Sequence, residues 1–436
     1  MSFSSTIFIV IFLPIFLICW RLLPDKWHSV EMLAGSLLFY AYGQPVMVLA
    51  LMASIGANFG LYQIMRKGGK PGLAAMIIGV ELNLIPLIYC KITGTMPLGI
   101  SFYTFQAISL QVDLYRAGSG AEPVDFFTYA SFLSMFPKLT MGPIARFKDM
   151  QTQTEGNISA GLRLFVVGLS MKVLLADSLG SVWSNVCATG VLGLSTATAW
   201  LGALAYTLEL YMDFWGYSLM AMAIGIMLGI PIPANFNDPY CSKTVAEFWR
   251  RWHITLGSWF RDYVYIPLGG SRKGAFRTFI NLLVVWALTG IWHGNGLNFL
   301  AWGLVLFIFI ALEKYTPLGR LQDTKVLGHL YILLVIPLTW VIFACSDLTM
   351  AVQYLECMFG IYQDQAVPTM TQFWRYLRDN WYFFGVALAL ITPYPARLYR
   401  KWGQKWPVSL ALVGLFWLSM YMLYKSGSSG FLYYQF

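Results

Sequence analysis

The chain has 436 residues, of which 58% are hydrophobic, 17% aromatic and only 11% charged, and its mean hydropathy is +0.62. An ordinary soluble domain carries roughly 25% charged residues. This composition therefore excludes a cytosolic enzyme, a disordered scaffold and a secreted disulfide-rich module. It predicts an all-α polytopic membrane protein.

Long stretches without Asp, Glu, Lys or Arg support this class. They are residues 1–20, 32–65, 92–112, 178–208, 214–237, 278–312, 326–346 and 406–424. Since a spanning helix needs about 20 apolar residues, we expect roughly ten to twelve tilted transmembrane helices together with re-entrant ones. The stretch 278–312 is long enough for two helices joined by a tight turn. We interpret the first segment as a retained helix, not a signal peptide.

The distribution of charge predicts the topology. Two short spans at 30–42 and 46–64 flank Gly43-Gln44-Pro45. Because basic loops stay cytoplasmic, the loops 21–29, 66–72 and 393–407 are expected inside and the mildly acidic loop 347–379 outside. The N-terminus would then lie outside.

The whole chain is predicted to be one integral-membrane domain. Its parts are N-terminal spans (1–115), two funnel or re-entrant segments (116–157 and 233–277), spans around a candidate histidine (278–346) and C-terminal spans (347–436). The six cysteines form no CxxC pair, so neither a metal site nor a disulfide framework is predicted.

Segment 243–277 is rich in basic and aromatic residues, with seven Lys or Arg against two acids. Glu247, Arg250 and Arg251 are spaced to meet on one helical turn. We expect one helix here, ending at Leu268-Gly269-Gly270. It could lie at the headgroups with snorkelling arginines, or line a cytoplasmic funnel that attracts the phosphates of a carrier.

His293 lies in the middle of the charge-free stretch 278–312. An ionisable side chain at that depth is costly and is a candidate functional group. A neutral imidazole is the usual proton acceptor near pH 7. The alternative is a buried histidine that bonds a carbonyl. No GxSxG motif accompanies it, so serine acyl-enzyme chemistry has no support.

Five motifs occur in a fixed order. They are PLGISFYTFQ at 97–106, FP followed by GPI within 136–144, EFWRRWHI at 247–254, WFRDY followed by YIPLGG within 259–270, and GIWHG at 290–294. Together they resemble the membrane-bound O-acyltransferase superfamily, and more closely its bacterial alginate O-acetyltransferase branch. The ending FLYYQF at 431–436 is similar to that branch as well.

The resemblance implies a ring of tilted helices around a thin core, with opposed funnels that meet at a catalytic histidine. The matching position is His293, and the second polar position of the family matches His253. We predict that the donor-binding funnel includes Glu247, Trp249, Arg250, Arg251, Arg261, Trp292, Asn295 and Asn298.

The expected function is transfer of an acyl group, in particular acetyl, from a cytoplasmic thioester to an extracytoplasmic polysaccharide such as an alginate-like polymer, cellulose or peptidoglycan. The donor would be acetyl-CoA or a phosphopantetheine carrier protein, with no bound cofactor. One alternative is D-alanyl transfer toward teichoic acid. Another is a non-catalytic transporter or flippase, although the chain lacks the repeat symmetry typical of transporters.

The predicted location is the bacterial inner (cytoplasmic) membrane, and membrane lipid is therefore a partner. A cytoplasmic acyl carrier and a separate extracytoplasmic acyltransferase are also expected partners, whereas nucleic acid is not. The aromatic ending 431–436 could dock the outer partner, or it could pack back as an interfacial aromatic belt.

Overall fold

The computed structural model describes residues 1–436 except 119, 121, 151–153, 362–369, 428–429 and 433–436. The described residues form helices and a single isolated β-bridge, between Phe236 and Trp252. Eight of the described helices are long and apolar enough to cross a membrane: Met47–Met65, Gly69–Thr93, Ile158–Ala188, Thr196–Leu228, Ala275–His293, Leu297–Tyr315, Leu327–Ala344 and Trp406–Ser426. The all-α polytopic class is confirmed. The expected ten to twelve also counted shorter segments, such as the apolar Phe8–Leu22.

The chain forms two compact units. The first contains the described parts of Met1–Leu169, Tyr217–Ala234 and Leu423–Gln435, and the second contains those of Ser170–Gly216 and Asn235–Met422. Helix α10 (Thr196–Leu228) contributes residues to both.

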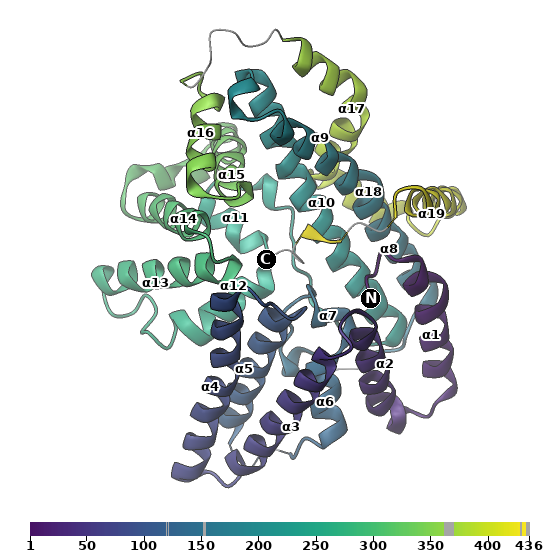
Figure 1. The fold of residues 1–436 in the computed structure, drawn as a ribbon. Coiled ribbons are helices and arrows are strands. Elements are labelled where there is room, and N and C mark those ends of the chain that lie inside the picture. Colours follow the sequence, from purple (N-terminus) through teal and green to yellow (C-terminus); the bar gives the residue numbers. More distant parts are fainter. Residues whose placement is uncertain (119, 121, 151–153, 362–369, 428–429, 433–436) are drawn as a thin grey trace. The chain divides into compact units, whose positions relative to one another are not determined.

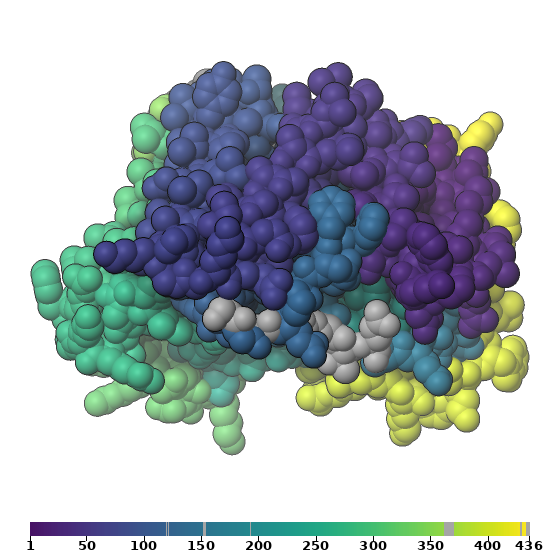
Figure 2. Space-filling model, turned by 90° about the horizontal axis from the view of Figure 1, so that it is seen from below, coloured from purple at the N-terminus to yellow at the C-terminus, as the bar shows by residue number. Residues whose placement is uncertain are grey.

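The helices of the first unit follow one another closely along the chain (Figure 1). They are η1 (Phe8–Phe12), α1 (Leu13–Leu22), α2 (His28–Gly43), α3 (Met47–Met65), α4 (Gly69–Thr93), α5 (Ile100–Ala117), α6 (Phe126–Ser134), α7 (Phe136–Leu139) and α8 (Ile158–Ser170). The predicted spans 30–42 and 46–64 correspond to α2 and α3. In the space-filling view the purple and blue atoms of these helices lie against one another on this face of the molecule (Figure 2).

Amide side chains join three helices inside this unit. Asn58 on α3 and Asn83 on α4 donate to each other's carboxamide oxygens at 3.2 and 2.8 Å. Gln111 on α5 donates to the Asn58 oxygen at 3.0 Å. Such bonds between apolar helices satisfy polar groups that lipid could not.

The aromatic ending of the chain is described only in part. Phe431 is fully buried, and its ring meets that of Tyr217 edge-on at 5.0 Å. Phe431 is therefore not an exposed docking element, because its surface is already covered. Residues 433–436 of the proposed element lie outside the described residues.

The second unit holds most of the remaining helices. They are the π-helical η4 (Met171–Ala176), α9 (Asp177–Ala188), α11 (Val245–Arg251), α12 (Ile254–Phe260), α13 (Ala275–His293), α14 (Leu297–Tyr315), α15 (Leu327–Ala344), α16 (Leu348–Met358), α17 (Thr371–Leu390), α18 (Tyr394–Trp402) and α19 (Trp406–Ser426). The stretch 278–312 does form two helices, α13 and α14, which lie side by side (Figure 1).

A buried ion cluster in this unit was not anticipated. The Lys172 ammonium lies 2.7 Å from both the Asp177 and the Asp213 carboxylates. Glu209, one turn before Asp213 on α10, is also buried. The two acids separate the charge-free stretches 178–208 and 214–237, and α10 runs through both acids without a break. Lys172 makes this possible for Asp213, because its ammonium compensates the charge of that carboxylate inside the unit.

We expect Lys172→Met to lower the free energy of unfolding in detergent by about 3 kcal/mol or more, because it leaves buried carboxylates without their cation. Thermal unfolding of the purified protein measures the effect. The matched control is Lys314→Met in the same unit, since Lys314 is exposed and its loss should change stability by less than about 0.5 kcal/mol. Equal effects of the two substitutions would contradict the assigned role of the cluster.

Candidate active site

The backbone turns sharply at His253. The single helix expected over 243–267 is wrong, because α11 ends at Arg251 and α12 begins at Ile254. His253 between them has φ +46°, a left-handed conformation that non-glycine residues rarely adopt.

The residues just before 238 are extended, and their backbone hydrogen bonds stabilise the break between α11 and α12. The amide of Asn237 donates to the Arg251 carbonyl at 3.0 Å, and the amide of Ile254 donates to the Asn235 carbonyl at 3.0 Å. These bonds flank the bridge between Phe236 and Trp252. They use backbone groups that a continuous helix would have paired within itself, so they stabilise the break.

Two acceptors secure the start of α11. Thr244 caps the helix, and its hydroxyl accepts from the amide of Glu247 at 3.1 Å. The Glu313 carboxylate, from α14, accepts from the amides of Val245 and Ala246 at 2.5 and 2.9 Å. Helix N-termini favour negative charge, so Glu313 ties this short helix to α14.

A cavity of about 490 Å³ opens beside the break. Four of the predicted site residues line it together: Trp249, Arg250, His253 and Arg261. Its other walls come from α11 to α14 and the π-helix η7 (Arg261–Tyr265), namely Ala246, Trp252, Ile254, Leu256, Gly257, Ser258, Phe260, Tyr265, Leu282, Val285, Trp286, Thr289 and Ile310. The cavity thus combines two arginines and a histidine with apolar and aromatic walls.

His253 is only 2% exposed. Its ring meets Phe214 edge-on at 4.7 Å, and its Nδ1 bonds the Asn235 side-chain oxygen at 3.3 Å. Burial lowers the pKa of His253 to about 3, because the charged imidazolium is poorly solvated there. The imidazole is therefore neutral at physiological pH.

His293 is the last residue of α13 and is 3% exposed. Three rings surround it edge-on: Trp292 at 4.8 Å, Trp302 at 5.0 Å and Phe343 at 5.2 Å. This aromatic shell comes from α13, α14 and α15. It places an imidazole in an almost water-free setting, as the sequence predicts for a residue at that depth.

Tryptophans connect the two histidines. The Trp292 ring centroid lies 6.3 Å from that of His253 and 4.8 Å from that of His293. The two imidazoles are therefore no more than about 11 Å apart, the sum of these distances. On the cavity side, Trp249 contacts Trp302 at 5.4 Å, which makes the cavity wall continuous with the shell of His293.

The remaining predicted residues do not line the cavity. Glu247 and Arg251 pair with each other at 2.7 Å, as their i, i+4 spacing predicts. Asn298 donates to the Cys345 carbonyl at 2.9 Å and so joins α14 to the end of α15. Asn295 is exposed in the turn between α13 and α14.

The sequence reasoning missed Asn235, Trp302 and Phe343. An Asn in the extended segment before residue 238 carries no periodic signal, and aromatic residues within apolar spans look like ordinary core. Trp302 follows His293 by nine residues, but only the pairing of α13 with α14 brings the two rings together.

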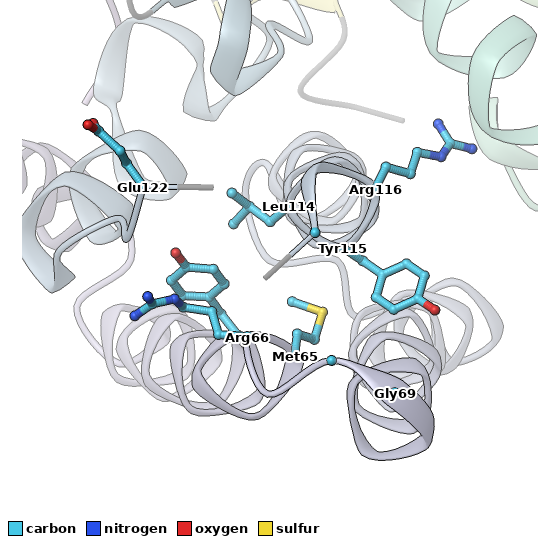
Figure 3. Close-up of a pocket in the computed structure, with 10 residues that line it drawn as sticks. Met65, Arg66, Gly69, Leu114, Tyr115, Arg116 and Glu122 are labelled. Carbon is cyan, nitrogen blue, oxygen red and sulfur yellow. The ribbon is translucent and has the colours of Figure 1, made fainter. Parts of the chain in front are cut away.

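A second cavity, of about 400 Å³, lies in the first unit. Figure 3 shows Arg66 and Glu122 on one side of it, while Arg116 extends away from Glu122. Arg116 lies 3.9 Å from Asp113. No histidine or cysteine is among the residues that line this cavity, so it is not the candidate active site.

Residues 116–353, which include the cavity and both histidines, match the membrane-bound O-acyltransferase family. The chain belongs to the membrane-bound O-acyltransferase family. It is therefore an O-acyltransferase and a multi-pass membrane protein, and the non-catalytic transporter is set aside.

Named relatives fall into three groups. The chain is 36% identical to a probable alginate O-acetylase of Pseudomonas putida, over 83% of this chain and 80% of that protein. It is 30% identical to a peptidoglycan O-acetyltransferase of Helicobacter pylori, over 82% and 80%. It is 31% identical to a teichoic acid D-alanyltransferase of Streptococcus thermophilus, over only 51% and 60%. The similarity to the alginate-type branch is thus confirmed.

The contact between α13 and α14 is expected to be sensitive to a single methyl group. A Cβ on Gly303 would lie 2.4 Å from the Trp286 carbonyl oxygen, so Gly303→Ala must push the two helices apart. We expect a loss of about 1–3 kcal/mol in unfolding free energy. A Cβ on Gly414 of α19 would meet nothing within 4 Å, so Gly414→Ala should leave the melting temperature unchanged or slightly higher. A stable Gly303→Ala variant would refute the close approach.

The neutral state of His253 makes stability depend on pH. Between pH 6.5 and about 3 the unfolded chain binds a proton at this residue that the folded chain does not. The contribution of neutral His253 to the free energy of unfolding is therefore complete above pH 6.5. It is lost as the pH falls, by at most about 1.4 kcal/mol per pH unit. Unfolding of wild type and His253→Gln, compared at pH 7.5, 6.5 and 5.5, measures it. The variant should show the shallower decline, and parallel curves would contradict the prediction.

Proposed function

We propose that this protein passes an acetyl group from a cytoplasmic thioester across the inner membrane of a bacterium for O-acetylation of an extracytoplasmic polysaccharide. The observation that carries the proposal is the cavity at the break between α11 and α12. It combines His253 with two arginines, and its wall continues through Trp249 into the aromatic shell of His293.

The cavity suits a thioester donor on the side of the arginines. Arg250 and Arg261 would attract the phosphates of acetyl-CoA or of a phosphopantetheine arm. The apolar walls would receive the rest of the arm and the acetyl group. Exclusion of water by these walls would protect the thioester from hydrolysis.

His293 is proposed as the general base. Its imidazole takes the proton of an attacking hydroxyl, the hydroxyl oxygen bonds to the acyl carbon, and the carbon–sulfur bond breaks. The imidazolium then returns the proton to the leaving thiolate, so the step is balanced. The neutral His253 assists on the donor side.

The relatives that are named as O-acetyl enzymes favour acetyl over D-alanyl as the transferred group. The chain matches more than four fifths of its own length to the alginate and peptidoglycan O-acetyl enzymes, and about half to the D-alanyltransferase. D-alanyl transfer toward teichoic acid remains the second candidate, since that match includes part of the same family region.

We also propose that a separate acyltransferase on the outer face completes the transfer. The longest segment predicted outside, 347–379, is too short to form an extended groove for a polymer. The acyl group would pass from this protein to that partner, and a cytoplasmic acyl carrier could deliver it.

We expect a strain that carries His293→Ala in the chromosomal gene to have little base-labile acetate on its cell-surface polysaccharide. The amount should be less than a tenth of that in wild type. The reason is that no other side chain of the aromatic shell can accept a proton at neutral pH. Chromatography of acetate and of D-alanine released by mild base measures the outcome, with immunoblots to confirm equal protein in the membrane.

Lys314→Met serves as the control and should retain normal acetylation. Acetate above a tenth of the wild-type level in His293→Ala would refute the assigned base. Loss of released D-alanine with unchanged acetate would instead establish the second candidate.

A further inference from the structure

Asn235 lies at the centre of the break that shapes the site. It is 1% exposed. Its backbone carbonyl accepts from the amide of Ile254 at 3.0 Å. Its side-chain oxygen accepts from the Thr255 hydroxyl at 2.6 Å and contacts Nδ1 of His253 at 3.3 Å. Asn235 thus bonds both the His253 ring and the backbone amide of the residue that follows it in the left-handed turn.

The contact with Nδ1 determines which nitrogen of His253 carries hydrogen. A carboxamide oxygen can only accept, so Nδ1 must donate. In a neutral imidazole the other nitrogen, Nε2, then has a lone pair and no hydrogen. Nε2 is buried and has no hydrogen-bond partner among the described residues.

Buried acceptors without a partner are uncommon in folded proteins. Other buried side chains in the described part of this chain share the feature, so it is the cavity beside His253 that makes its Nε2 a candidate acceptor. His253 lines the cavity of about 490 Å³, and its backbone is held in a strained conformation. Strain of this kind persists where surrounding bonds enforce it, commonly at functional sites. The bonds that enforce it here belong in large part to Asn235.

We propose that Asn235 is a positioning residue, which holds His253 in the tautomer with hydrogen on Nδ1 so that Nε2 accepts a hydrogen bond from the substrate. The tautomer assignment follows from the geometry alone, and only the use of Nε2 by the substrate rests on the proposed acyl transfer. Asn235 itself touches no reacting atom.

Nitrogen-15 NMR of the protein in lipid bilayers tests the tautomer directly. The chain has only four histidines, so uniform histidine labelling and a His253→Gln spectrum identify the His253 signals. In wild type we expect Nδ1 to be protonated and Nε2 to be unprotonated. In Asn235→Leu, which lacks the acceptor, the proton should move to Nε2 in a substantial fraction of molecules. Protonated Nε2 in wild type, or an unchanged pattern in Asn235→Leu, would overturn the proposal.

The pH dependence of acetyl transfer is a second readout. Asn235→Asp keeps an acceptor for Nδ1 but adds a negative charge beside the ring, which favours the imidazolium. We expect the acidic limb of its rate profile to move to higher pH by about one unit or more, with activity recovering at alkaline pH. Asn235→Leu should lose at least tenfold in rate at every pH. Should Asn235→Leu fail to fold, the displaced profile of Asn235→Asp decides the question, and an undisplaced profile refutes the proposal.

Asn281 provides the matched control. It is equally buried, at 1% exposed, and donates to the Gly270 carbonyl at 2.9 Å. Asn281→Ala should lower the melting temperature, as loss of a buried amide does, yet leave the His253 signals and the pH profile unchanged. If wild type shows the expected tautomer but transfers no acetyl group, the proposed function fails while the positioning role stands. If acetyl transfer is present and the tautomer is insensitive to Asn235, the positioning role fails.

Discussion

The geometry of the second unit depends on one short pairing between backbones. The extended residues around Phe236 bridge to Trp252 and interrupt what would otherwise be one continuous helix. A non-glycine residue in the left-handed region costs about 1–2 kcal/mol. The backbone bonds of Asn237 and Ile254 offset this cost. As a result of the break, His253 becomes part of the cavity wall, together with residues of α11 and α12.

Aromatic side chains connect the break to the surroundings of His293. Trp249, one turn before the break, contacts Trp286, Trp302 and Trp340 at 5.2 to 5.7 Å. These rings come from three different spanning helices. They replace water with weakly polar, close-packed surface, and interactions between any charge that develops there and fixed dipoles are correspondingly stronger.

Two of the buried ionisable groups in the described part of the chain have a polar partner close by. Lys172 lies between two carboxylates, and Glu313 accepts from the first amides of α11. The cavity arginines differ in kind, because both are exposed. Arg261 pairs with the neighbouring Asp262 at 2.7 Å, and on our proposal the phosphates of a thioester donor would be a further counter-charge. Buried charge therefore serves the fold in the first two cases, whereas the exposed cavity arginines serve, on our proposal, the substrate.

Hydropathy alone determined that the protein is helical and crosses the membrane several times. The reason is that a run of apolar residues is a local property of the sequence, and such a run partitions into the bilayer whatever the rest of the fold. The order of the motifs indicated the family in the same way. The i, i+4 pairing of Glu247 with Arg251 and the hairpin of α13 and α14 were likewise visible, since both depend on neighbours in sequence. The break at His253 was not visible: the residue that enforces it, Asn235, stands eighteen positions earlier. Nor could hydropathy show that α10 would carry two buried acids, because the cation that pairs with Asp213 comes from another helix. The cavity and the shell of His293 arose only from tertiary structure, since each is built from side chains of several helices whose packing no single segment determines.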